Sequence, residues 1–193
     1  EIFNEILGKS SDSLNVKNAG KKEPQIVVVT SAAGGVGKTT LSVNIAHELI
    51  RKNPHVKVLV VDSDPQQSAL NWSEVREKSP PFDIIGFVKK SLHRDLPSVA
   101  SNYDFIVIDG PPRVTELARS CIMASDIIII PCTPSPYDIW ASSETVNLIN
   151  ESRIYKEKLK SVFAINRRII NTAIGRDVAE ALEDLKTPVL KSH

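Results

Sequence analysis

The chain has few cysteines and almost no net charge. It contains two cysteines among 193 residues, and its formal net charge is only +1. Cys121 and Cys132 lie in or just after apolar runs and show no metal-ligand spacing, so we expect two buried thiols in a reducing compartment. A net charge close to zero excludes a strongly basic nucleic-acid binder, so any contact with DNA must come from a local patch.

Long hydrophobic segments are also missing. The longest unbroken apolar runs, such as residues 127–130, are far too short to cross a bilayer. The first residues include the acids Glu1 and Glu5 and lack the apolar block of a signal peptide. We therefore expect a cytoplasmic protein without a membrane partner.

The chain divides into a short polar segment and one domain. Residues 1–24 are mostly rich in Ser, Asn, Lys and Gly and end at Pro24, which predicts an N-terminal polar appendage. Residues 25–193 are of a length that one hydrophobic core accommodates, so we expect a single domain there.

Val- and Ile-rich runs of strand length alternate with helical segments throughout this domain. Because these runs are almost continuously apolar, they predict an α/β fold with a mostly parallel central sheet that has helices on both faces. Ligands of such sheets gather outside the carboxyl ends of the strands. The expected strands are 25–31, 56–62, 82–88, 104–110, 126–132, 160–166 and 188–191, and the expected helices are 39–52, 67–78, 94–103, 114–124, 136–151 and 175–185.

The segment GGVGKTT, residues 34–40, joins the first expected strand to the first expected helix. Its glycines let backbone N–H groups turn around a phosphate, Lys38 can reach the β- and γ-phosphates, and the Thr39 hydroxyl can bind Mg²⁺. The strict pattern has a glycine where Ala32 stands, and a Gly-rich turn that caps an ordinary helix is the alternative. The residues expected to bind nucleotide here are Gly34, Gly35, Val36, Gly37, Lys38, Thr39 and Thr40.

Acidic residues follow two of the other expected strands. Asp62 and Asp64 lie at the end of the second strand, and Asp109 ends the strand DFIVIDG. Carboxylates at these places can hold a metal-bound water or position an attacking water, although each is also a common turn residue. Their position after a phosphate-loop helix favours the functional interpretation.

Two further segments are open to two interpretations. Asn166 and Arg167 end a strand, where an amide can pair with an adenine edge or simply form a surface turn. Ser135 precedes a helix and is followed by an acid at Asp138, which predicts a capping-box-like start. The aromatic residues of this helix start, Tyr137 and Trp140, are expected either at an interface or in the core.

Taken together, these motifs resemble the ParA/MinD family of deviant-Walker-A P-loop ATPases, with the closest resemblance to small single-domain ParA-type partition ATPases. The segments that carry it are VVVTSAAGGVGKTT, VLVVDSDPQQSALNW, FIVIDGPPR, ASDIIIIPCTPSPYDIW and INRRIINTAIGRDVAEAL. The resemblance implies an ATPase with ATP/ADP and Mg²⁺ as cofactors, a homodimer formed with ATP, and nonspecific DNA binding on the nucleoid. It also implies a ParB-like activator or cargo adaptor, with which the ATPase partitions plasmids or positions other cargo.

The resemblance also assigns roles to single residues. Lys38 and Asp64 match catalytic positions, the aspartate being the one that orients the attacking water. Thr39 and Asp109 match Mg²⁺-binding positions, and Asp62 supports the metal shell. The adenine-facing asparagine corresponds to Asn166, with Arg167 beside it in the nucleotide site.

The sequence departs from the family at Ala33, where members usually have a lysine that reaches the partner subunit's phosphates. Such a charge-assisted contact is worth about 1.5–3 kcal/mol, so its loss is expected to weaken the ATP dimer and hydrolysis. One alternative is therefore a nucleotide-gated binding module with weak hydrolysis. The others are a MinD-like membrane-positioning ATPase and a small-molecule ligase or synthase. Candidate DNA-binding residues are Arg153, Lys156, Lys158, Lys160, Arg167 and Arg168, although a solvated helix face also explains this run.

Overall fold

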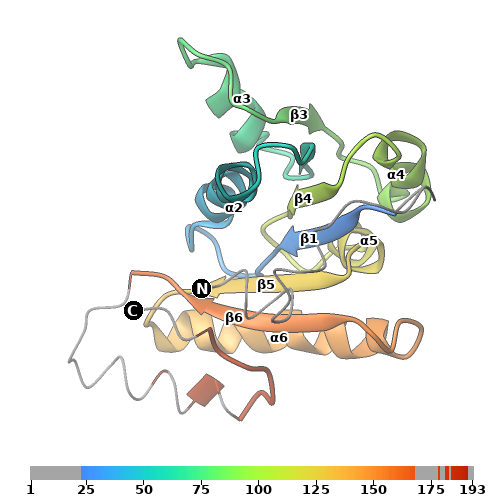
Figure 1. Cartoon of the computed structure of the whole chain (residues 1–193). Coiled ribbons are helices and arrows are strands. Elements are labelled where there is room, and N and C mark those ends of the chain that lie inside the picture. Colours follow the sequence, from blue (N-terminus) through green and yellow to red (C-terminus); the bar gives the residue numbers. More distant parts are fainter. Residues whose placement is uncertain (1–22, 168–177, 179–180, 183, 191–193) are drawn as a thin grey trace.

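A parallel β-sheet forms the centre of the molecule, as the apolar runs predict (Figure 1). The structure is a computed structural model that describes residues 23–167, 178, 181–182 and 184–190. Within these residues, the strand order is β3-β2-β4-β1-β5-β6, and all neighbouring strands are parallel. The strands are β1 (Gln25–Val29), β2 (Val58–Asp62), β3 (Asp83–Gly86), β4 (Phe105–Asp109), β5 (Ile127–Cys132) and β6 (Lys160–Ile165).

Helices cover both faces of this sheet. The described helices are α2 (Lys38–Lys52), α3 (Ser68–Glu74), α4 (Leu92–Ala100), α5 (Glu116–Ala124) and α6 (Pro136–Arg153). Buried side chains of α4, α5 and α6 pack on one face, and those of α2 and α3 pack on the other. None of the helices in the described part of the chain has the length and apolar character needed to cross a bilayer.

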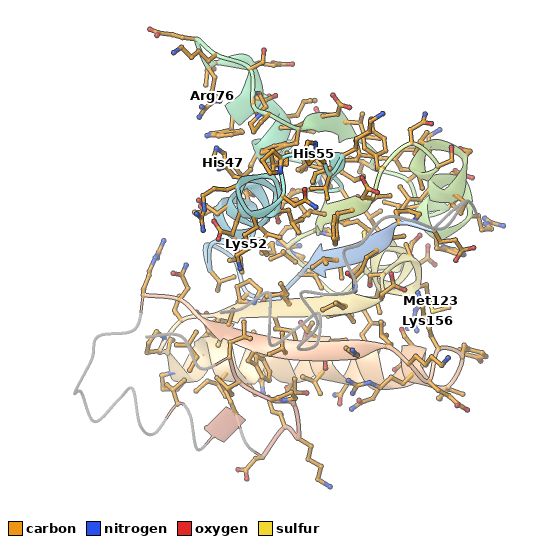
Figure 2. All side chains as sticks on the ribbon, viewed as in Figure 1. His47, Lys52, His55, Arg76, Met123 and Lys156 are labelled. Atoms are coloured by element: carbon orange, nitrogen blue, oxygen red, sulfur yellow. The ribbon has the colours of Figure 1, made fainter. Side chains whose placement is uncertain are left out.

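Lys156 holds the carboxyl end of α5 to the segment that follows α6. Its Nζ donates to the carbonyl oxygens of Ser125 at 2.6 Å and Met123 at 3.3 Å, and Figure 2 shows Lys156 beside Met123. A cation at the end of a helix satisfies carbonyl groups that have no partner within the helix. Lys156 therefore contributes to the packing of α5.

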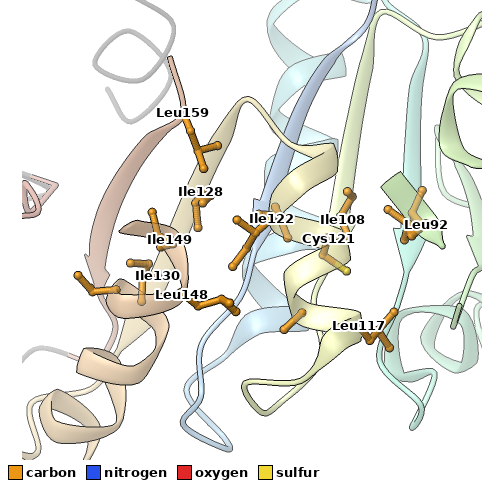
Figure 3. Packing of buried hydrophobic residues seen from close by; sticks show 14 of the residues in the cluster. Leu92, Ile108, Leu117, Cys121, Ile122, Ile128, Ile130, Leu148, Ile149 and Leu159 are labelled. Atoms are coloured by element: carbon orange, nitrogen blue, oxygen red, sulfur yellow. The ribbon is translucent and has the colours of Figure 1, made fainter. Parts of the chain in front are cut away.

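The core consists of two layers because successive strand residues point to opposite faces. Val28 packs toward α4, α5 and α6, whereas Val27 and Val29 pack toward α2. Figure 3 shows the first layer, in which Cys121 lies among buried aliphatic side chains. Both cysteines are free and buried, as predicted, and burial raises the pKa of each thiol to about 12.

Several element boundaries differ from the predictions. The helix expected over residues 67–78 ends at Glu74, and α4 begins at Leu92 because Leu92 and Leu96 both pack into the core. Three parts of the prediction lie outside the described residues: most of the expected helix 175–185, residues 1–22 of the expected appendage 1–24, and Arg168. Of the expected strand 188–191, Val189 forms a single bridge to Phe163.

The predicted capping box at the start of α6 is wrong. Ser135 is the N-cap residue but makes no side-chain capping bond. Asp138 instead accepts hydrogen bonds from the hydroxyl and the backbone N–H of Thr133. Tyr137 and Trp140 are 70% and 66% exposed, so the expectation of core packing is excluded for both.

Candidate functional site

The parallel register gathers the predicted residues at one edge of the sheet. Asp109 pairs with Val29 of β1 on one side and with Asp62 of β2 on the other. The loop of residues 30–37 follows β1, so it begins directly beside Asp109. Asn166 follows β6 at the same edge, because the carboxyl ends of parallel strands coincide.

Two glycines give the loop its shape. Gly35 and Gly37 have φ values of 70° and 93°, a region that side chains with a Cβ rarely adopt. A Cβ at Gly37 would lie 2.5 Å from Nδ2 of Asn166. Ala32 is not among the described non-glycine residues with positive φ, which explains why alanine is tolerated there in place of the expected glycine.

The N–H groups of the loop fall into two sets. Those of Ala32 and Ala33 donate to the hydroxyl oxygens of Thr145, at 3.0 Å, and Ser31, at 3.3 Å. Within the described part of the chain, the N–H groups of residues 34–37 donate to no protein atom. They are followed by the N-terminus of α2, whose first N–H groups have no partner within the helix. Such a set of free donors is suited to an anion with several oxygens.

Lys38 is the first residue of α2, and its side chain turns back across the loop. Its Nζ donates to the Ala33 carbonyl oxygen at 3.2 Å, and the residue is only 7% exposed. Burial lowers the pKa of Lys38, and the charges of Asp64 and Asp109 oppose this change. The Lys38 ammonium therefore lies against the loop and within reach of the charges of Asp64 and Asp109.

Asp109 is fully buried and lacks part of its hydrogen bonding. Its Oδ1 accepts from the Ser42 hydroxyl at 3.1 Å, whereas its Oδ2 has no hydrogen-bond partner among the described residues. Burial raises the pKa of this carboxyl to about 6, the nearby Thr39 and Ser42 hydroxyls oppose the rise, and the Asp62 charge adds to it. A buried carboxylate oxygen without a partner fits a cation or a metal-bound water.

The other two acids are bound mainly to the backbone that follows β2. Asp62 accepts from the N–H groups of Asp64 at 3.1 Å, Ala69 at 2.9 Å and Leu70 at 3.0 Å, so it fixes the start of α3. Burial raises the pKa of Asp62. Asp64, 8% exposed, accepts from the Gln66 N–H at 2.8 Å. The structure thus gives Asp62 a structural partner set, and its part in a metal shell stays a prediction.

The residues present fit Mg²⁺ only together with a phosphate ligand. In the described ranges, no group of three or more His, Cys, Asp or Glu side chains is arranged to hold a metal ion. Mg²⁺ commonly binds through one or two carboxylates, water and substrate phosphates, so this is the donor set expected of a metal–nucleotide site. Thr39 and Asp109 are the residues that would hold the ion.

Asn166 connects the end of β6 to the loop. Its Nδ2 donates to the Val36 carbonyl oxygen at 3.0 Å, and its backbone N–H donates to the Cys132 carbonyl oxygen at 2.7 Å. It also lines a pocket of about 260 Å³ at this edge. The lining residues are Gly37, Thr40, Leu41, Asn44, Pro131, Ala164, Ile165, Asn166 and Leu190. An apolar pocket with a few amides next to the loop is suited to a planar base.

Two residues of the site have no counterpart in the sequence analysis. Ser42 lies one helical turn beyond Thr39, a spacing from which its position beside Asp109 follows. Thr145 lies 113 residues from Ala32, and no local pattern connects the two. Arg167, predicted to be in the nucleotide site, has a left-handed backbone with φ of 57° and an exposed side chain.

The chain is similar in sequence to known proteins. The sequence profile of the CobQ/CobB/MinD/ParA nucleotide binding domain matches residues 27–192. The chain is 34% identical over 170 residues to the maintenance of carboxysome distribution protein A of Halothiobacillus neapolitanus, covering 85% of this chain and 76% of that protein. It is 37% identical over 166 residues to the protein of the same name from Gloeobacter kilaueensis, covering 85% of this chain and 70% of that one.

The fold is also similar to solved structures. Cobyrinic acid a,c-diamide synthase from Mycobacterium smegmatis, solved with ADP and magnesium, superposes with a TM-score of 0.69 over 83% of this chain and 82% of that chain. The sequence identity is 17%, so this likeness shows the fold alone.

Replacing Gly37 tests the loop geometry. Gly37→Ala combines a left-handed φ with a contact of 2.5 Å to Asn166, so we expect it to lower the free energy of unfolding by about 1–3 kcal/mol in urea denaturation. Gly34→Ala is the matched control, because a Cβ there has no atom within 4 Å and its stability should be unchanged or slightly higher. Equal stability of the two variants would contradict the described loop conformation.

Replacing Asp109 tests the electrostatic strain of the site. Each unit of pKa difference is worth about 1.4 kcal/mol, so a pKa of about 6 instead of 3.8 means that the ionised carboxylate destabilises the folded state by about 3 kcal/mol. The native protein should lose this stability as the pH rises from about 4 to above 6. In urea denaturation at pH 7.5, the free energy of unfolding of Asp109→Asn should therefore exceed that of the native protein by about 1–3 kcal/mol. This gain in stability should vanish near pH 4. A gain that is independent of pH would contradict this explanation.

Proposed function

This chain belongs to the CobQ/CobB/MinD/ParA nucleotide-binding family, and we propose that it is a ParA-type Mg²⁺-dependent ATPase that partitions or positions a cellular cargo. The family consists of P-loop ATPases, and the profile match covers nearly all of the domain expected over residues 25–193. The relatives that are 34% and 37% identical are named for carboxysome distribution. This favours a positioning ATPase over a ligase or synthase of the same fold.

One observation carries the proposal. The N–H groups of residues 34–37, which donate to no atom of the described residues, and the buried Nζ of Lys38 adjoin a carboxylate, Asp109, whose Oδ2 has no partner there either. A protein does not leave such groups unsatisfied without an energetic cost, and a triphosphate with its metal ion would satisfy all of them at once. The pocket beside Asn166 would then receive the base.

The proposed reaction transfers the γ-phosphoryl group of ATP to water, which gives ADP and phosphate. Lys38 and the loop N–H groups bind the phosphate oxygens and stabilise the charge that develops there. Asp64, which keeps 8% of its surface exposed, orients the attacking water. Thr39 and Asp109 would hold Mg²⁺, which would neutralise phosphate charge, and the Ser42 hydroxyl holds the Asp109 carboxylate in position.

We also propose an ATP-dependent homodimer whose coupling is weak because of Ala33. The Ala33 side chain is small and 3% exposed, and it brings no charge toward a second subunit. Ala33 also motivates the second candidate function, a nucleotide-gated binding module with slow turnover. The partner would be a ParB-like activator or cargo adaptor in the cytoplasm, with the dimer on the nucleoid.

Nonspecific DNA binding needs a surface that the dimer leaves open. Two of the six predicted DNA-binding residues already form hydrogen bonds within the protein. Arg153 donates to Leu159, Asn150 and Ser161. Lys156 donates to the carbonyl groups at the end of α5 (Figure 2). The exposed residues Lys158 and Lys160 lie at the amino end of β6, about 20 Å from Arg167 at its other end. We assign DNA binding to Lys158 and Lys160, since the nucleotide edge would face the second subunit.

Restoring a lysine at position 33 tests the proposed ATPase. Ala33→Lys should raise steady-state phosphate release by about tenfold or more if a charge-assisted contact across the dimer is regained. Ala33→Met is the control for side-chain bulk at this buried position and should not accelerate release. Native turnover comparable to that of Ala33→Lys would exclude the binding-module alternative, and absence of Mg²⁺-dependent ATP binding in the native protein would contradict the proposed function itself.

Charge reversal tests the DNA surface. Lys158→Glu with Lys160→Glu should abolish the ATP-promoted retention of DNA in gel-shift assays at low salt, and native binding should weaken steeply as salt increases. Lys78→Glu with Arg94→Glu changes the net charge equally at exposed residues of other elements and should retain binding. Equal loss in both double variants would show that net charge, not this surface, determines binding.

A further inference from the structure

The hydrogen bond between Thr145 and Ala32 joins a core helix to the phosphate loop. Thr145 lies in the middle of α6 and is 3% exposed, and its Oγ1 accepts from the Ala32 N–H at 3.0 Å. The position of α6 is set by the core, because its neighbouring residues Val146 and Ile149 are buried under the sheet. Thr145 is therefore a fixed acceptor placed against the first turn of the loop.

Other buried hydroxyls of the same helix behave differently. Ser142 donates to the Asp138 carbonyl oxygen at 2.7 Å, and Ser152 donates to that of Leu148 at 2.9 Å. Bonds of this kind, back to the preceding turn, are the usual choice of Ser and Thr inside a helix. Thr145 instead accepts from a residue outside its helix, so helix geometry alone does not account for it.

The bond belongs to the first of the two sets of loop N–H groups. In that set the loop is tied to the protein: Ser31 accepts from the Ala33 N–H, and the Ala33 carbonyl oxygen accepts from Lys38. Beyond Ala33, the N–H groups of residues 34–37 donate to no atom of the described residues. The bonds of Ala32 and Ala33 thus anchor the segment that leads directly into the free donors.

We propose that Thr145 is a positioning residue for nucleotide binding: its hydroxyl oxygen holds the Ala32 N–H so that the following N–H groups converge on the phosphates. The inference rests on the proposed function, because it assumes that phosphate binds to these groups. Donors that are already oriented bind without an ordering cost, and a buried N–H that loses its acceptor must find another partner by moving the loop.

The test compares Thr145→Val, which keeps the shape and removes the acceptor, with Thr145→Ser, which keeps the hydroxyl. We expect about tenfold weaker binding of Mg²⁺–ATP and Mg²⁺–ADP in Thr145→Val, measured by calorimetry, and affinity within about twofold of native in Thr145→Ser. Ser152→Ala is the matched control, since it removes a buried hydroxyl of the same helix that bonds only within it. Its nucleotide affinity should equal that of the native protein.

A second readout does not depend on nucleotide. In the nucleotide-free protein, amide hydrogen exchange of residues 30–37 should be faster in Thr145→Val than in Ser152→Ala. Native ATP binding combined with unchanged affinity and exchange in Thr145→Val would overturn the inference alone. If the native protein binds no Mg²⁺–ATP, the proposed function fails, and the inference fails with it.

Discussion

The pairing of β1 with β4 and β5 is the constraint on which the rest of the structure depends. It places the end of β1 next to Asp109 on one side and Ile129 of β5 on the other, so the loop after β1 leaves the sheet beside the polar end of β4. The loop then turns into α2, whose residues Ile45, Ala46 and Leu49 pack on the sheet. Because both ends of the loop belong to buried elements, a short Gly-rich segment keeps a defined shape.

This arrangement concentrates unfavourable electrostatics at one edge. Burial raises the pKa values of Asp62 and Asp109 and lowers that of Lys38, so each charged form is disfavoured by desolvation. The cores on both faces of the sheet stabilise the domain enough to retain these groups. A ligand that carries negative oxygens and a cation would reduce this conflict.

The extent to which the sequence predicts this structure follows from the range of each interaction. Local patterns predict the six main strands, their alternation with helices, the parallel sheet, and the positions of Lys38 and Asp109. The structure agrees with these predictions. The end of α3 and the hydrogen bond that Thr133 donates to Asp138 differ from the predictions because turn geometry decides them. The contacts of Thr145 and Asn166 with the loop join segments more than 100 residues apart, so only the packed fold reveals them.

The two alanines at the start of the loop have different physical consequences. At Ala32 the backbone needs no positive φ and its N–H is held by Thr145, so a methyl group is compatible with the loop. Ala33 contributes through its backbone: its N–H donates to Ser31 and its carbonyl oxygen accepts from Lys38, while its methyl group is buried. The loop therefore has these internal bonds without a lysine at position 33. Ala33 carries no charge, so in the proposed ATPase it would leave nucleotide binding intact and weaken only the contact between subunits.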